Sequence, residues 1–292
     1  MALADELAVE VAAILKDQFE VSVGWAIPSL ADVPFDNAGK QLRLVSLFVD
    51  IRRSTDLVTA LGLETSARMY KAYLRGVTRI VRDRGGQVLS FNGDGIVAGF
   101  VGSSAGNAAV LSALNINWFN THTLKPFVTE QLENRASTLA FDWGVGIDAG
   151  NVLVVKSGMR GTDNSDLVWA GNPVNFSAKI NSLASSPWNI YVSDTVHSEL
   201  HASLTTTSNG SDLWEPWMWL DKGMTLWRTR WWFNPGHVPT VPRRPSMLSL
   251  LGLPPAQPKK GLLESIYGTG TMGDLMKPTL FDYLRHRGKG RR

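Results

Sequence analysis

The chain has 292 residues, of which 44% are hydrophobic and 19% charged, a balance that favours a globular protein with a substantial buried core. It contains no cysteine, which excludes disulfides, thiolate nucleophiles and cysteine-ligated metal sites. No apolar run reaches the roughly 18 residues that a membrane helix needs, and acidic residues near the N-terminus argue against a signal peptide. We therefore expect a cytoplasmic protein without membrane insertion.

Charge is unevenly distributed along the chain. Residues 241–292 contain ten Lys/Arg and three Asp/Glu, a net charge of +7, and the remainder carries −4. A mildly acidic main domain is not typical of nucleic-acid-binding proteins, so we expect no nucleic-acid partner. The composition instead favours small-molecule ligands held by a metal.

Local composition divides the chain into three parts. Residues 1–40 combine an amphipathic helix over 4–19 with a proline- and glycine-containing connector over 24–39. Residues 41–236 hold the main domain. Proline, glycine and basic residues dominate beyond it, so 237–292 is expected to be a loosely ordered C-terminal extension.

Strands and helices are predicted to alternate along the main domain. The expected strands lie at 42–49, in two short runs within 87–100 around the turn Asn92–Gly95, in a pair within 139–155 broken at Asp148–Asn151, and in the tryptophan-rich segment 212–233. The expected helices lie at 64–84, 104–120 and 171–183. Because two of the connections are hairpins, we expect an α/β (α+β), ferredoxin-like mixed sheet with flanking helices.

Two aspartates occupy positions suited to metal binding. Asp50 ends an apolar strand, and the following Ser54 and Thr55 can cap a helix, which indicates a phosphate-binding turn beside a carboxylate. Asp94 lies at the tip of a glycine-flanked hairpin that can lie beside that strand. Paired aspartates next to such a turn suit phosphoryl chemistry with Mg²⁺ or Mn²⁺. The alternative is that Asp50 merely begins a turn.

Five motifs, in order, resemble those of the class III nucleotidyl cyclases, over roughly Leu42 to Phe233. They are Phe48-Val49-Asp50-Ile51, Asn92 to Phe100, Gly146 to Val152, Gly171 to Lys179, and Asp221-Lys222-Gly223. The resemblance implies the ferredoxin-like mixed sheet of the class III cyclase catalytic domain. It also implies a nucleoside triphosphate substrate and two divalent metal ions per site, Mn²⁺ or Mg²⁺.

The same resemblance implies roles for individual residues. The implied metal ligands are Asp50, the Ile51 carbonyl and Asp94. The implied phosphate-binding residues are Arg52, Arg53, Ser54, Thr55 and Lys222. The implied catalytic residues are Asn175, for which a helix-start cap is the alternative role, and Lys179, where the family usually has arginine. Lysine keeps the positive charge of arginine but loses its planar fork.

Family geometry also implies the assembly. In that family the metal-binding half of one subunit meets the transition-state half of another across a two-fold interface. Asn175, Lys179 and Lys222 would therefore come from the opposing subunit. One chain carries both halves, so we expect a homodimer with active sites at the interface.

The base-binding positions depart from the purine-selecting members of the family. Those members carry a lysine and an aspartate or threonine where this chain has Ser90 and Val168, so the hydrogen bonds that read adenine are lost. Phe48 and Trp169 are expected to narrow the base pocket. This pattern resembles the pyrimidine cyclases of the bacterial antiphage system Pycsar, which implies conversion of UTP to cyclic UMP and pyrophosphate as a second messenger. The alternatives are a cytidylate cyclase, a purine cyclase and a catalytically silent nucleotide-binding regulator.

Overall fold

The computed structural model describes residues 2–158, 165–207 and 209–236, so the expected extension at 237–292 lies outside the described residues. The strands are β1 (Glu20–Val23), β2 (Ala38–Ile51), β3 (Gln87–Asn92), β4 (Gly95–Phe100), β5 (Trp143–Gly158), β6 (Ser165–Ala170), β7 (Ile190–Ser193), β8 (Glu215–Trp219) and β9 (Met224–Thr229). The helices are α1 (Leu3–Lys16), α2 (Ser54–Leu61), α3 (Leu63–Asp83), α4 (Ala105–Phe119), α5 (Lys125–Glu133), α6 (Asn172–Leu183) and α7 (Asp194–Ser198). A π-helical turn joins α4 to α5, and short 3₁₀ turns precede β8 and β9.

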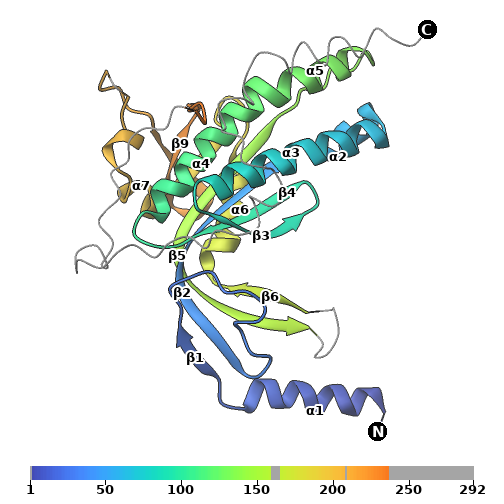
Figure 1. The fold of residues 1–292 in the computed structure, drawn as a ribbon, viewed down its shortest axis with the longest axis vertical. Coiled ribbons are helices and arrows are strands. Elements are labelled where there is room, and N and C mark those ends of the chain that lie inside the picture. The colour runs from blue at the N-terminus through green and yellow to red at the C-terminus, as the bar shows by residue number, and fades with distance from the viewer. Residues whose placement is uncertain (1, 159–164, 208, 237–292) are drawn as a thin grey trace, which may run out of the picture. The chain divides into compact units, whose positions relative to one another are not determined.

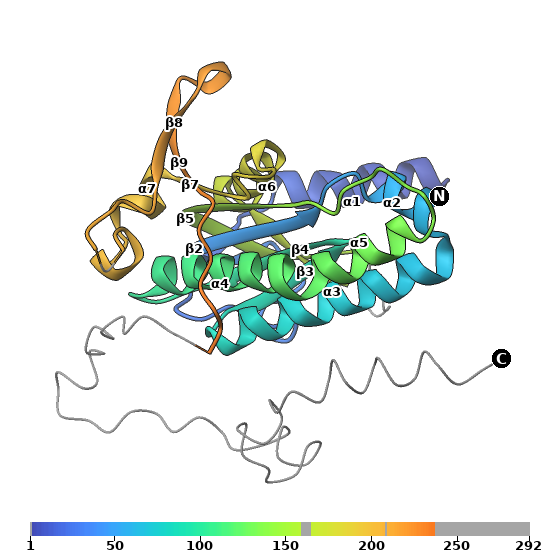
Figure 2. The ribbon, with the colours of Figure 1, turned by 90° about the horizontal axis from the view of Figure 1, so that it is seen from above.

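The predicted α/β mixed sheet is confirmed. Within the described part of the chain the strands form one sheet in the order β3-β4-β2-β5-β7-β9-β8, with β1 added to β2 and β6 added to β5 (Figure 1). β2 and β5 are long antiparallel partners at its centre, whereas β5 pairs with β7 in parallel. Figure 2 shows α3 and α4 on one side of this sheet and α6 on the other.

Side chains of β2 alternate between these two layers. Leu47, Val49 and Ile51 are buried in the main core together with apolar residues of α3 and α4. Ser46 points to the opposite face, where its hydroxyl lies 2.9 Å from that of Ser177 in α6. By the same alternation Asp50 lies on the α6 face, at the end of the strand.

The centre of β5 differs from the sequence prediction. A turn was expected at Asp148–Asn151, but β5 runs through these residues without a break. The prediction was wrong because every one of them pairs with β2, which keeps the backbone extended. The glycine there serves close packing instead, since a Cβ on Gly150 would lie 3.0 Å from Cγ of Pro173 at the start of α6. The second hairpin of this region follows later, between β5 and β6.

The N-terminal region contributes a strand as well as a helix. β1 pairs in parallel with β2, although the sequence indicated only a connector between the first helix and the main domain. β2 begins at Ala38 and so crosses the division expected at residue 40. α1 contains no buried residue. None of the helices in the described ranges is long and apolar enough to span a membrane.

The tryptophan-rich segment forms the hairpin β8–β9, which projects from the sheet in Figure 2. The end of β8 next to the turn packs against α6, where the rings of Trp219 and Phe176 lie 5.6 Å apart. Its tip is a turn closed by Gly223 at a φ of 60°. Leu220 and Lys222 are exposed on this turn. The hairpin therefore ends in a turn that leaves Lys222 exposed to solvent.

Candidate active site

The ends of β2 and β4 bring Asp50 and Asp94 together. β4 pairs with β2 from Val45 to Val49, so the turn before β4 lies beside the end of β2. A Cβ on Gly95 would lie 3.3 Å from Oδ1 of Asp50 and 3.2 Å from Cζ of Phe48. Gly93 has a φ of 62°, which favours glycine. The two glycines therefore allow the Asp94 turn to approach the Asp50 carboxylate closely.

The two carboxylates repel each other when both are ionised. Burial, followed by the neighbouring Asp94, raises the pKa of Asp50 to about 7, although the nearby Arg52 guanidinium acts in the opposite direction. Oδ2 of Asp94 is buried and has no hydrogen-bond partner among the described residues. Two close carboxylates and an unpaired buried acceptor call for a cation, and oxygen ligands of this kind suit Mg²⁺ or Mn²⁺. The pair thus fits the divalent metal that the sequence motifs imply.

The two carboxylates alone supply too few ligands for a complete metal site. Within residues 2–158, 165–207 and 209–236, no group of three or more His, Cys, Asp or Glu side chains gathers where it could hold a metal. Further ligands would have to be main-chain carbonyls, substrate oxygens or water. The predicted role of the Ile51 carbonyl agrees with this need and stays a prediction.

Mn²⁺ is expected to raise the thermal unfolding temperature more at pH 8 than at pH 5. Asp50 keeps its proton up to about pH 7 in the folded chain, whereas its ordinary value is 3.8, so metal-free stability falls as pH rises between these values. At pH 8 a cation pairs with both ionised carboxylates, and at pH 5 the proton competes with it. Melting curves with and without Mn²⁺ measure the two shifts. Equal shifts at both pH values, or an undiminished shift in Asp50→Asn, would contradict the assignment.

The turn after β2 presents the start of a helix beside the carboxylates. Arg53 adopts a left-handed conformation with a φ of 54°, and α2 begins at the next residue, Ser54. The first N–H groups of a helix have no intrahelical partner and attract anions. The hydroxyl of Tyr70 in α3 donates a hydrogen bond to the Ser54 carbonyl oxygen at 3.3 Å and thereby ties the turn to α3. Arg53 itself is exposed and paired with Asp56 at 2.8 Å.

The backbone of Arg52 is part of this turn, but its side chain is engaged by α6. Its side chain is half-buried and its Nη2 donates to the carbonyl oxygen of Asn181 in α6, and to Oδ1 of the same residue at 2.6 Å. Sequence reasoning grouped Arg52 with the phosphate-binding residues and did not single out Asn181. The available signal was weak: Ser177 and Asn181 are polar residues one turn apart on the side of α6 that also carries buried apolar residues.

Asn175 and Lys179 lie on the far side of α6. They are one turn apart and exposed, whereas Ser177 and Asn181 on the opposite side are buried against the sheet. Asn175 is inside the helix, which begins at Asn172, so the alternative role as a helix cap is wrong. Both side chains point away from the sheet that carries Asp50. One chain therefore does not gather its own Asp50, Asn175 and Lys179 into one site.

The four predicted base-binding residues are divided between two faces. Ser90 pairs with Val97 of β4, and Val97 pairs with Phe48 of β2. Ser90 and Phe48 therefore lie in one row across the sheet, on the face that also carries Asp50. Trp169 packs on the apolar cluster around Leu42 and Val154 on that same face of the sheet. Its neighbour Val168 is turned to the other face and is 46% exposed. Ser90 and Val168 therefore do not face one pocket within a single chain.

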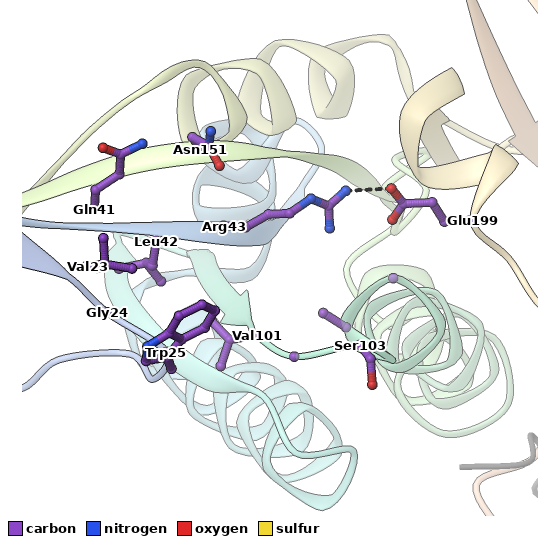
Figure 3. Close-up of a pocket in the computed structure, with 13 residues that line it drawn as sticks. Val23, Gly24, Trp25, Gln41, Leu42, Arg43, Val101, Ser103, Asn151 and Glu199 are labelled. Carbon is purple, nitrogen blue, oxygen red and sulfur yellow. Dashed lines mark hydrogen bonds and ion pairs between the residues drawn. The ribbon is translucent and has the colours of Figure 1, made fainter. Parts of the chain in front are cut away.

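A pocket of about 580 Å³ lies further back along β2 (Figure 3). Its lining includes Gln41, Arg43 and Asn151 from the sheet, together with Trp25 and residues at the start of α4. An ion pair of 2.6 Å joins Arg43 Nη2 to Glu199 Oε1 at its wall. Neither Asp50 nor Asp94 belongs to its lining, so this pocket is separate from the carboxylate pair.

Comparison with solved structures shows a nucleotide cyclase fold. The adenylyl cyclase CyaB from P. aeruginosa matches 65% of this chain and 95% of its own, with a TM-score of 0.53 and 18% identity. The guanylyl cyclase Cya2 matches 68% of this chain and 98% of its own, with a TM-score of 0.53 and 19% identity. The predicted fold of the class III cyclase catalytic domain is thereby confirmed.

Comparison of sequences identifies closer relatives. No family model matches the chain. A uridylate cyclase from Burkholderia cepacia is 31% identical over 79% of this chain and 98% of its own length. A uridylate cyclase from Xanthomonas perforans is 29% identical over the same shares of the two chains, and one from Rhodovulum sp. is 24% identical over 81% of this chain. The chain therefore belongs to the uridylate cyclase family.

Proposed function

We propose that this chain converts UTP to 3′,5′-cyclic UMP and pyrophosphate at sites shared between two copies of the chain. The observation that carries the proposal is the Asp50–Asp94 pair, with its buried unpaired Oδ2, beside the open start of α2. The relatives named uridylate cyclase support the choice of UTP. The product would act as a second messenger in bacterial antiphage defence, as the resemblance to Pycsar cyclases implies.

The reaction joins two parts of one nucleotide. The 3′-hydroxyl oxygen attacks the α-phosphorus, the bond from that phosphorus to the bridging oxygen of the β-phosphate breaks, pyrophosphate leaves, and the hydroxyl proton passes to water. Divalent ions held by Asp50 and Asp94, with the Ile51 carbonyl, would neutralise the triphosphate and lower the pKa of the hydroxyl. The amides of Ser54 and Thr55, with Arg53, would bind the phosphates. Asn175 and Lys179 would steady charge on the α-phosphate, and Lys222 would contact the terminal phosphates.

The exposure of the second group of residues supports a shared site. Asn175 and Lys179 project from the outer side of α6, and Lys222 lies on the projecting β8–β9 turn. A second copy of the chain can bring its own α6 and hairpin to the Asp50 face, which completes the site. In a two-fold dimer both sites are then equivalent.

The experiment that tests the function is incubation of the purified chain with each of the four ribonucleoside triphosphates and Mn²⁺. Product masses identify the cyclic nucleotide formed. Cyclic UMP and pyrophosphate in equal amounts support the proposal. A chain that binds UTP and Mn²⁺ but forms no cyclic product from any of the four would contradict it.

Mixing two inactive variants is expected to restore activity. In a mixture of Asp50→Ala and Asn175→Ala chains, each mixed dimer has one intact site, with Asp50 from one copy and Asn175 from the other. Random exchange should give about a quarter of wild-type activity, since half of the dimers are mixed and one of their two sites works. Cyclase assays after subunit exchange measure it. An inactive mixture in which exchange has been demonstrated would rule out the shared site.

A further inference from the structure

The C-terminal half of α6 is held by polar contacts to the strands that lead to the carboxylate pair. Asn181 Nδ2 donates to the Gly144 carbonyl at 2.6 Å and reaches the Phe48 carbonyl at 3.4 Å. The carbonyl and Oδ1 of the same residue accept from Arg52. Asn181 is thus the junction between α6, β5 and the end of β2.

Gly146 makes this junction possible. A side chain at this position would collide with the Ser177 carbonyl oxygen and the Asn181 backbone nitrogen, so α6 lies directly on the β5 backbone. One turn earlier, Ser177 donates to the Val174 carbonyl at 2.9 Å and therefore receives its other hydrogen bond from Ser46 of β2. The helix is consequently fixed to the sheet at two successive turns.

Arg52 is well suited to hold the end of this helix. α6 ends at Leu183, so the Asn181 carbonyl belongs to the last turn; its oxygen accepts from the Ala184 N–H at 2.9 Å and uses its remaining lone pair for Arg52. A cation at this end interacts favourably with the helix dipole. The guanidinium is turned to α6 by its two contacts to Asn181, and its Nε is buried without a partner in the described part of the chain. The main chain of Arg52 is anchored in turn, because its N–H donates to the Asp142 carbonyl at 2.9 Å.

The contact joins the two functional halves of one chain. Arg52 directly follows Asp50 and Ile51, two of the proposed metal ligands, and α6 carries Asn175 and Lys179 on its outer side. In the dimer proposed above, these outer residues serve the site of the second copy. The contact between Arg52 and Asn181 thus lies between the metal-binding turn of one copy and the helix that would complete the site of the other.

We propose that Arg52 is a positioning residue that couples the two active sites of the dimer. Through Asn181 it sets the position of α6, and thereby of Asn175 and Lys179, for the site on the second copy. This rests on the proposed shared-site cyclase. It replaces the phosphate-binding role that the sequence indicated for Arg52, because the guanidinium is already engaged by α6.

Mixed dimers separate the two roles of Arg52. In the Asp50→Ala plus Asn175→Ala mixture, the one working site takes α6 from the Asp50→Ala chain and its metal-binding turn from the other. Arg52→Met in the Asp50→Ala chain is expected to lower kcat by about tenfold to a hundredfold with little change in KM, since small misplacements of reacting groups have effects of this size. Arg52→Lys in that chain should retain an intermediate activity because it keeps the charge without the fork.

A phosphate-binding role for Arg52 predicts different kinetics in the same mixtures. If Arg52 binds phosphate, Arg52→Met raises KM for UTP only when placed in the Asn175→Ala chain, and it has no effect in the Asp50→Ala chain. That outcome would overturn the proposal. Arg68→Met, which removes an exposed arginine paired with Glu64 on α3, is the matched control and should leave both parameters unchanged in either chain.

Hydrogen exchange supplies a readout that does not depend on turnover. In full-length homodimers, Mn²⁺ with UTP is expected to slow amide exchange at the C-terminal half of α6 in the wild type and not in Arg52→Met. Identical exchange of α6 in the two proteins would overturn the coupling. If none of the four nucleotides is cyclised, the proposed function fails while this comparison still decides the role of Arg52.

Discussion

Alanine at Asp50 or Asp94 is expected to reduce cyclase turnover by about a thousandfold or more while the chain stays folded. Each substitution removes one of two carboxylates at a site where metal binding supplies several kcal/mol of charge stabilisation. Folding should not suffer, because the two carboxylates oppose each other in the metal-free state and Oδ2 of Asp94 is buried without a partner among the described residues. Loss of Asp94 relieves both penalties.

Three measurements check this prediction. Steady-state assays with Mn²⁺ give kcat, thermal melts of the metal-free proteins give stability, and calorimetry gives metal affinity. The metal-free Asp94→Ala chain should melt no lower than the wild type. Asp83→Ala, which removes an exposed carboxylate at the end of α3, is the control and should keep full activity. Near wild-type turnover in Asp50→Ala or Asp94→Ala would remove the basis of the proposed function.

Local pattern was sufficient to predict most of the central fold. Apolar runs gave β2 and β4, and the Asn92–Gly95 turn gave the hairpin between β3 and β4. Helical periodicity gave α3, and the Gly-Asn-Pro start gave α6, both within a residue or two of their bounds. These signals are contained within each segment. β1 is different, because all of its residues are exposed and its strand character comes only from pairing with β2. The expected break in β5 failed for the same reason, since pairing with β2 overrode the turn composition.

The candidate site could likewise be predicted only where the signal lies within one segment. Asp50 and Asp94 could be paired from sequence because a strand end and a hairpin tip can each be recognised from local composition. The direction of Arg52 could not, because it depends on how closely α6 approaches Gly146, and only the folded sheet defines that approach. The separation of Asn175 from Asp50 was implied by family resemblance, and the structure adds a reason: the buried side of α6 is already occupied by Ser177 and Asn181.

Base selectivity is the second large effect that we expect. Ser90 shares the face and row of Phe48, next to the carboxylate pair, and it offers a single hydroxyl where purine-selecting relatives carry lysine. Adenine or guanine placed there would lose hydrogen-bond partners for its polar edge. Each unpaired group in a desolvated pocket costs on the order of 1–3 kcal/mol, which is about a ten- to hundredfold preference.

The chain should therefore use UTP with a kcat/KM at least about a hundredfold above those for ATP and GTP, and CTP should rank second. Ser90→Ala is expected to lower kcat/KM for UTP by about tenfold through loss of one hydrogen bond to the base. Val168→Ala should change the preference less, because Val168 is turned to the face opposite that of Trp169. Side-by-side kcat/KM values for the four nucleotides at matched Mn²⁺ decide the question. Equal use of ATP and UTP by the wild type would show that Ser90 does not exclude purines, and a larger effect of Val168→Ala than of Ser90→Ala would place the base on the other face of the sheet.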